Sequence, residues 1–327
     1  MDWQCKQLER GCVGRMKKKG IEPALKKLSF IKTLKRDYWL YVFLIPGLLF
    51  FLIFKYLPMV GIVISFQDYS VVKGITGSPW VGLAHYEYLF KNPDFYRIFY
   101  NSLIISLYRL LWGFPIPIIL ALLMNEMNKH RYKRSMQTIM YLPHFVSWVV
   151  IIGMVYNLLS PSSGIFNHIL KAVGKDTIPF LTTPQYFRTI LVTTDIWKSA
   201  GWGTVVYMAA ISGIDPNLYE AAVIDGATRF QRIKSVTLPC IMSTIVVMLI
   251  LRTGTILNNG FEQVYLLSNA LVSEVAEIFE TYTYKVGLRE GRYSFAAAVG
   301  LFQSVVGCVL LFITNFSSKK LGGGGLW

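Results

Sequence analysis

The sequence has little charge for its length and lacks the usual nucleotide-binding motif. Charged residues make up 16% of the 327 positions, against 54% for hydrophobic ones, and long stretches carry almost no charge. The phosphate-binding pattern G-x-x-x-x-G-K-[ST] is absent, because Gly174-Lys175 lacks the leading glycine and is followed by Asp176. This composition excludes an ordinary soluble domain and predicts an all-α membrane protein with no ATP site of that type.

Histidine and cysteine are also scarce. The four histidines are scattered and the four cysteines lack metal-ligand spacing, so no metal site is predicted. No nucleophile elbow or Ser/Cys–His arrangement occurs either. The chain is therefore not expected to be catalytic. The residues concerned are His85, His130, His144, His168, Cys5, Cys12, Cys240 and Cys308.

Six apolar segments are long enough to cross a bilayer as helices, which takes about 20 residues each. They divide the chain into a basic tail (residues 1–36), a six-helix transmembrane domain (37–317) and a short tail (318–327). Met16 resembles a natural start, so we also expect residues 1–15 to be an upstream extension. The six predicted spans are residues 38–66, 98–124, 136–159, 189–211, 238–257 and 295–316.

The basic residues are distributed unevenly between the two sides of the predicted membrane. The terminal segments and the two loops on their side hold 20 of the 33 Lys and Arg, whereas the three loops of the other side hold 8. Cytoplasmic loops are enriched in Lys and Arg. The sequence therefore predicts a multi-pass protein of the cytoplasmic membrane, with both termini in the cytoplasm.

The polar loop over residues 212–239, between the fourth and fifth spans, is predicted to form two short helices. Asp215 is a good N-cap and Pro216 suits the first helical position, so residues 218–224 should be helical. Gly226 permits a turn or close packing of the two helices. A second helix is expected over residues 227–236, and Pro239 marks the entry to the fifth span.

Residues at fixed spacing in this loop carry a family resemblance. Glu220-Ala221-Ala222, then Gly226, then Val236-x-Leu238-Pro239 resembles the EAA loop of binding-protein-dependent ABC importer permeases, with Val in place of the usual Ile. The resemblance covers residues 37 to 327 and is closest to permeases for complex oligosaccharides such as those from alginate or pectin. Further matching segments are Pro115-x-Pro117, Asn125-Glu126, Tyr141-Leu142-Pro143, residues 281–284 and residues 291–297.

The resemblance implies a type I permease bundle that works in a heteromeric complex. Its expected partners are a homologous second permease, two ATPase subunits, an extracytoplasmic solute-binding protein and membrane lipid, and no nucleic acid. ATP and Mg would be held by the ATPase subunits, with no cofactor on this chain. The loop would be the coupling helix that docks on an ATPase. Its expected contact residues are Leu218, Tyr219, Glu220, Ala221, Ala222, Asp225 and Gly226.

Polar residues within the spans indicate a cargo pathway, because such residues usually face a bundle interior or water. Aromatic rings beside polar groups suit sugars, and an excess of one positive charge slightly favours acidic ones. A purely structural interpretation stays open, in which Asp195 and Lys198 neutralise each other and Arg109 binds backbone carbonyls. The candidates are Asn101, Tyr108, Arg109, Trp112, Asp195, Lys198, Trp202, Arg252, Asn259 and Glu262.

Two other functions remain as alternatives. An importer of the same architecture could carry peptides or amino acids, which only cargo binding would distinguish. A membrane-embedded enzyme of lipid or polysaccharide metabolism would need acids, histidines or metal ligands gathered at the membrane surface, and the sequence offers no such group.

Overall fold

The computed structural model describes residues 37–127 and 129–320. The predicted basic tail over residues 1–36 and the end of the C-terminal tail therefore lie outside the described residues. The chain divides into two units, one ending at Val60 and the other beginning at Gly61. The described residues are mostly helical, and their one isolated β-bridge pairs Gln67 with Trp80.

The first unit contains α3 (Tyr38–Phe51), a π-helical turn η1 (Leu52–Tyr56) and the start of the 3₁₀ segment η2 (Leu57–Phe66). Together with the rest of η2, these segments form 29 residues of continuous, strongly apolar helix, with the bounds that the sequence predicts for the first span. The charged Lys55 lies in the π-helical turn.

The second span is a helix of 33 residues, longer than the sequence predicts. It consists of α6 (Pro93–Tyr108), a π-helical turn η3 (Arg109–Gly113) and α7 (Pro115–Asn125). The Asn92 side chain caps its start by accepting a hydrogen bond from the Asp94 N–H at 3.0 Å. The wider turn directly precedes Pro115, whose missing N–H leaves a carbonyl of the preceding turn without its helical donor.

The third predicted span is not one continuous helix, and this expectation is corrected. Helix α8 (His130–Tyr141) continues into a 3₁₀ turn η4 (Leu142–Phe145), and α9 (Trp148–Leu159) then leaves at 98°. Pro143 removes a backbone donor at the start of η4. Ser147 restarts the helix, because its hydroxyl accepts from the Val150 N–H at 3.4 Å.

Helix α11 (Pro184–Ser212) corresponds to the fourth predicted span. Its 29 residues extend about 43 Å at 1.5 Å per residue, enough to cross a bilayer. It is less apolar than the other long helices, because Arg188, Asp195 and Lys198 lie within it.

The loop between α11 and the next span forms the two predicted short helices. Helix α12 (Pro216–Ile224) begins where predicted, capped by the Asp215 carboxylate, which accepts from the Asn217 N–H at 3.0 Å. The second helical run begins at 229, two residues later than predicted, because the Thr228 side chain caps it. This run comprises α13 (Arg229–Arg232), η5 (Ile233–Thr237) and α14 (Leu238–Cys240).

The fifth predicted span is also broken. The run that ends with α14 meets α15 (Met242–Gly254) at a bend of 61° next to Ile241. Beyond α15, the short helices α16 (Phe261–Leu267), α17 (Ser273–Ala276) and α18 (Phe279–Tyr284) and the turn η6 (Lys285–Arg289) lead to α19 (Tyr293–Lys320), the last span. Shorter helices elsewhere are α4 (Gly74–Gly77), α5 (Ala84–Lys91) and α10 (Ile165–Ala172).

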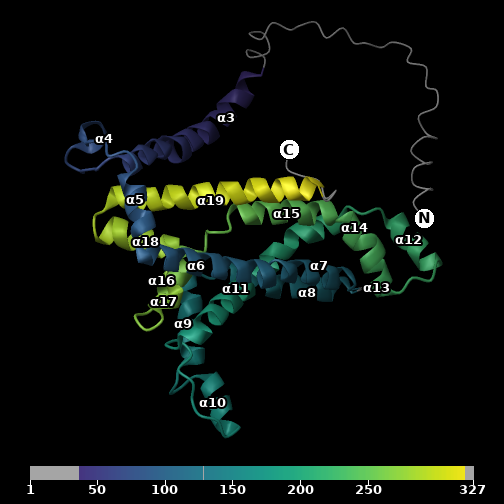
Figure 1. Cartoon of the computed structure of the whole chain (residues 1–327). Coiled ribbons are helices and arrows are strands. Elements are labelled where there is room, and N and C mark those ends of the chain that lie inside the picture. Colours follow the sequence, from purple (N-terminus) through teal and green to yellow (C-terminus); the bar gives the residue numbers. More distant parts are fainter. Residues whose placement is uncertain (1–36, 128, 321–327) are drawn as a thin grey trace, which may run out of the picture. The chain divides into compact units, whose positions relative to one another are not determined.

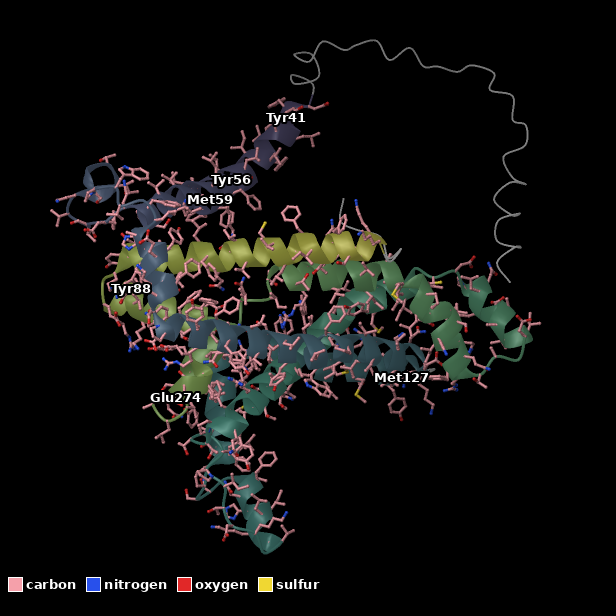
Figure 2. The ribbon with its side chains drawn as sticks, in the orientation of Figure 1. Tyr41, Tyr56, Met59, Tyr88, Met127 and Glu274 are labelled. Atoms are coloured by element: carbon pink, nitrogen blue, oxygen red, sulfur yellow. The ribbon has the colours of Figure 1, made fainter. Side chains whose placement is uncertain are left out.

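Within the second unit two groups of short helices lie at opposite ends of the long helices (Figure 1). Figure 1 shows α12 and α13 at one end of the long helices and α16 to α18 at the other. Met127, which follows α7, lies toward the first end, and Glu274 of α17 lies at the second (Figure 2). We call these the loop end and the α16–α18 end.

Among the described residues, three helices are long and apolar enough to cross a membrane, or five if each bent pair counts as one span. Helix α11 is long enough but is not among them. The structure therefore supports a helical membrane protein, and the count of six spans stays a prediction.

Glycines allow two close helix crossings. A Cβ on Gly201 of α11 would lie 1.9 Å from the Met140 carbonyl oxygen of α8, and a Cβ on Gly307 of α19 would lie 2.9 Å from the Gly254 carbonyl oxygen of α15. Small residues let helix backbones approach in this way, and close packing is the main attraction between helices in lipid.

We expect Gly201→Ala to destabilise the protein, because backbone atoms rather than a flexible side chain fill the space of the new methyl group. The cost should be about 1–3 kcal/mol or more, visible as a lower apparent melting temperature of the detergent-solubilised protein. Gly153→Ala in α9 is the matched control, since no atom lies within 4 Å of its Cβ position. Equal melting temperatures for both variants would contradict the close crossing.

Candidate functional site

The α12 helix of the 212–239 loop presents an exposed apolar surface. No residue of α12 is buried, and the exposed fractions are 47% for Leu218, 55% for Val223 and 86% for Ile224. Glu220, Ala221 and Asp225 are exposed as well, and Ala222 is partly buried. Exposed apolar groups that stand together commonly mark a protein contact. The geometry is therefore that of a short helix available for docking.

One side-chain contact joins the two helical parts of this loop, and a second connects the loop to α7. The Tyr219 hydroxyl lies 3.0 Å from Oγ1 of the buried Thr237, which connects α12 to η5. Arg232 Nη2 lies 3.7 Å from Glu126 Oε2, just after α7, and both side chains are about one-fifth exposed. A displacement of α12 would therefore be passed to the second helical run of the loop, and from Arg232 of that run to the end of α7.

Gly226 serves the turn, one of the two roles that the sequence allowed. No heavy atom lies within 4 Å of the position of its Cβ, so it does not provide close packing between the two short helices. Its backbone is left-handed, with φ of +75°, at the turn directly after α12. Glycine adopts this conformation without strain. The turn, rather than a tight contact, requires glycine here.

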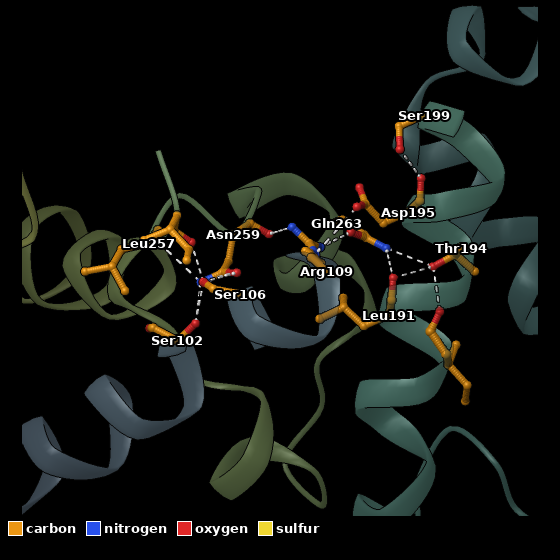
Figure 3. A network of polar contacts seen from close by, with 12 residues as sticks. Ser102, Ser106, Arg109, Leu191, Thr194, Asp195, Ser199, Leu257, Asn259 and Gln263 are labelled. Atoms are coloured by element: carbon orange, nitrogen blue, oxygen red, sulfur yellow. Dashed lines mark hydrogen bonds and ion pairs between the residues drawn. The ribbon is translucent and has the colours of Figure 1, made fainter. Parts of the chain in front are cut away.

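Arg109 is the centre of a buried polar network (Figure 3). Its guanidinium donates to the Asn259 carbonyl oxygen and to Gln263 Oε1, and its Nε lies 3.7 Å from Asp195 Oδ2. The Arg109 side chain is 6% exposed and that of Asp195 18%. Arg109 thus connects α6–η3, α11 and the segment that leads into α16.

Other polar groups complete the network around Asn259 and Gln263. Gln263 Nε2 donates to the Leu191 carbonyl oxygen and to Thr194 Oγ1, both at 2.8 Å. Asn259 Nδ2 donates to the Ser102 carbonyl oxygen at 3.0 Å, and its backbone N–H donates to Glu280 Oε1 at 2.7 Å. Burial raises the pKa of the Glu280 carboxyl group above its usual value.

Asn101 is buried in a second junction. Its Nδ2 donates to the Glu274 carbonyl oxygen at 2.7 Å and to that of Glu277 at 3.2 Å, and its Oδ1 accepts from Arg188 Nη2 at 2.8 Å. Asn101, Arg109 and Asn259 are therefore buried and connect helices in this conformation. Their predicted role in the pathway stays a prediction.

Lys198 and Asp195 do not pair with each other, although the sequence allowed that interpretation. Lys198 Nζ donates to the carbonyl oxygens of His144, at 3.1 Å, and Val146. It also lies 5.2 Å from the centre of the Trp148 ring. Its charge therefore satisfies carbonyls that the bend between η4 and α9 leaves without helical partners. Asp195 pairs with Arg109 instead.

The remaining candidates lie in different surroundings. Trp202 stacks on the His144 ring at 4.7 Å with an interplanar angle of 4°. Arg252 and Glu262 are exposed. Tyr108 and Trp112 line a groove of about 640 Å³ between α6–α7 and α11. The rest of its lining is Ile116, Arg188, Thr189, Val192, Thr193 and Ile196.

Sequence reasoning missed several members of these sites. Gln263 and Thr194 join the Arg109 network, and Arg188 lines the groove beside Tyr108 and Trp112. Arg188 lies near the start of a predicted span, where its charge could have been noted. Gln263 lies outside every predicted span, so no signal in the sequence pointed to its burial. No metal-binding group of three His, Cys, Asp or Glu side chains occurs among residues 37–127 and 129–320.

The chain is similar to known transport proteins. The family described as "Binding-protein-dependent transport system inner membrane component" matches residues 113–322. Protein LplB of Bacillus subtilis is 49% identical over 92% of this chain and 95% of its own length. The polygalacturonan/rhamnogalacturonan transport system permease protein YteP of the same organism is 45% identical over 92% of this chain and 94% of its own length.

Solved structures give a similar result. A chain of a bacterial alginate ABC transporter, in complex with an alginate pentasaccharide-bound periplasmic protein, aligns with a TM-score of 0.83 and 43% identity. The alignment covers 91% of this chain and 99% of the other. A structure of a bacterial ABC transporter involved in the import of the acidic polysaccharide alginate aligns with a TM-score of 0.81 and 44% identity. That alignment covers 89% of this chain and 98% of the other.

We expect Arg109→Ala to destabilise the protein strongly, because it leaves Asp195 and Gln263 Oε1 without their cationic partner. Removing one partner of a buried ion pair costs about 3–5 kcal/mol. Arg252→Ala is the control, since it removes an exposed arginine in a neighbouring helix. The apparent melting temperature in detergent would test this. A drop for Arg109→Ala no larger than the drop for Arg252→Ala would contradict a structural role for the network.

Proposed function

This chain belongs to the family of binding-protein-dependent transport system inner membrane components, and from that premise we propose that it is a permease subunit of an ATP-driven ABC importer of oligosaccharides. The observation that carries the proposal is the exposed α12 helix, with its EAA sequence and apolar tip, held at the loop end of the long helices. As a permease, the chain is not itself the enzyme that hydrolyses ATP.

The other subunits of the importer belong to this proposal. We infer a second, homologous permease and two ATPase subunits that hold ATP and Mg, with α12 docking on one of them. A solute-binding protein on the outer side would deliver the cargo, in line with the periplasmic protein in the alginate transporter complex. The excess of Lys and Arg in the tails and the 212–239 loop supports a cytoplasmic position for these segments.

The side-chain contacts of the loop suggest how movement of an ATPase would reach the spans. Force on α12 would pass through the Tyr219–Thr237 contact to the helical run that enters the fifth span. It would also pass through the Arg232–Glu126 ion pair to the end of α7. Alternating access would then arise from movement of these helices around the network centred on Arg109.

Acidic oligosaccharides are the cargo that we propose. The names of two similar proteins refer to polygalacturonan/rhamnogalacturonan and to alginate. Within this chain, the groove beside Tyr108 and Trp112 supports the idea, because it combines aromatic rings with the Arg188 guanidinium and has no acidic residue in its lining.

The proposed function predicts ATP-dependent uptake by the complete assembly in proteoliposomes that contain the binding protein. Oligogalacturonates should accumulate, whereas peptides and amino acids should not. Uptake of peptides without uptake of any oligosaccharide would contradict the assignment and favour the alternative cargo.

The coupling role predicts that Ile224→Glu weakens the contact with the ATPase, because it places a charge on the most exposed apolar side chain of α12. The ATPase should no longer co-purify with the permease, although membrane abundance stays normal. Val72→Glu is the matched control, since Val72 is 96% exposed but lies in a predicted outer loop. Normal co-purification with Ile224→Glu would refute docking through this tip.

A further inference from the structure

A small cavity lies at the α16–α18 end of the second unit, and none of the residues of the Arg109 network lines it. Its volume is about 200 Å³, below the range of about 300–1,000 Å³ that is typical of drug-sized ligands. It therefore suits one sugar ring better than a longer chain. Side chains of α16, α18 and η6 contribute most of its chemistry, namely Tyr265, Tyr284, Lys285 and Arg289.

Arg289 is held in a fixed position although it is exposed. Its Nη2 donates to the Tyr265 hydroxyl at 2.7 Å. Its guanidinium carbon lies 5.8 Å from the centre of the Tyr265 ring and 5.6 Å from that of Tyr284, within the range of cation–π attraction. An exposed arginine normally loses conformational entropy when it binds a ligand. Here the two tyrosines already hold the Arg289 side chain before any ligand binds, so less conformational entropy would be lost on binding.

The charge of the lining favours an anion. Glu277 is the one acidic residue among the lining residues, and two cations already approach it. Its Oε2 lies 3.4 Å from Arg97 Nη2, and its Oε1 lies 3.8 Å from Lys285 Nζ. With Arg289 and Lys285 in the lining, one positive charge remains in excess.

The neutral hydroxyl groups of the lining offer few donors to a ligand. Ser268 and Ser273 donate to the carbonyl oxygens of Tyr265 and Ala270, at 3.2 and 2.9 Å. Thr281 donates to the Ile278 carbonyl oxygen at 3.1 Å. The lining therefore offers a ligand two cationic side chains beside the tyrosine hydroxyls, and a carboxylate is the acceptor that matches a guanidinium best.

We propose that this cavity binds the carboxylate-bearing ring of one uronic-acid residue, with Arg289 and Lys285 on the carboxylate and a tyrosine ring against the sugar. It would be a contact point for acidic cargo outside the spans. The biological meaning of the site depends on the proposed function, but its binding chemistry can be measured independently.

The test is the binding of trigalacturonate to the purified assembly without its binding protein, measured by calorimetry in lipid nanodiscs. We expect Arg289→Gln to weaken binding at least tenfold, and Tyr265→Phe to weaken it less, because the ring stays while the hydroxyl that positions Arg289 is lost. Arg292→Gln is the matched control. Its guanidinium also stacks on two rings, Tyr88 at 4.9 Å and Phe295 at 4.8 Å, but it does not line this cavity.

Three results would overturn the inference: no binding of trigalacturonate, equal binding by the Arg289→Gln and Arg292→Gln variants, or equal affinity for the fully methyl-esterified trimer.

ATP-driven uptake by the wild-type assembly separates this site from the proposed function. If uptake of oligosaccharides continues while binding is unaffected by Arg289→Gln, the site is wrong and the importer stands. If binding behaves as expected but no oligosaccharide is taken up, the site stands and the importer assignment is wrong.

Discussion

A guanidinium deep in a predicted span has to be paired, and much of the second unit is arranged around that requirement. A cation away from water is costly unless acceptors surround it. Arg109 receives its acceptors from Asn259, Gln263 and Asp195, which belong to two other parts of the chain. The π-helical turn that begins at Arg109 lies within this junction, so the helix geometry and the pairing are parts of one arrangement.

The same constraint explains how the broken spans are tolerated. A bend in a helix frees backbone carbonyls, and a membrane offers no water to satisfy them. At the 98° bend in the third predicted span, Lys198 from α11 donates to two such carbonyls. The charged side chains that make α11 the least apolar of the long helices thus bind groups in other segments of the chain. A charged residue in a span can therefore serve the architecture without contacting any cargo.

Local sequence signals were enough for much of the fold. Asp215 and Pro216 marked the start of α12 correctly, and the apolar run over residues 38–66 gave the bounds of the first helix. The bends next to Pro143 and Ile241 were not predicted, because apolar periodicity reports the length of a span but not its continuity. The Asp195–Lys198 pair of the structural interpretation followed from helical spacing, whereas in the structure the two residues bind different partners in other helices. Burial of Gln263 depends on contacts with η3 and α11, which no local pattern encodes.

The crossing of α15 and α19 at Gly254 and Gly307 restricts how the protein can move. Where a carbonyl oxygen lies against a residue that has no side chain, sliding by even one residue would bring it against a bulkier neighbour. These two helices should consequently behave as a single rigid block. Any rearrangement transmitted along the fifth span then has to be absorbed at the bend next to Ile241, which would make that bend a hinge.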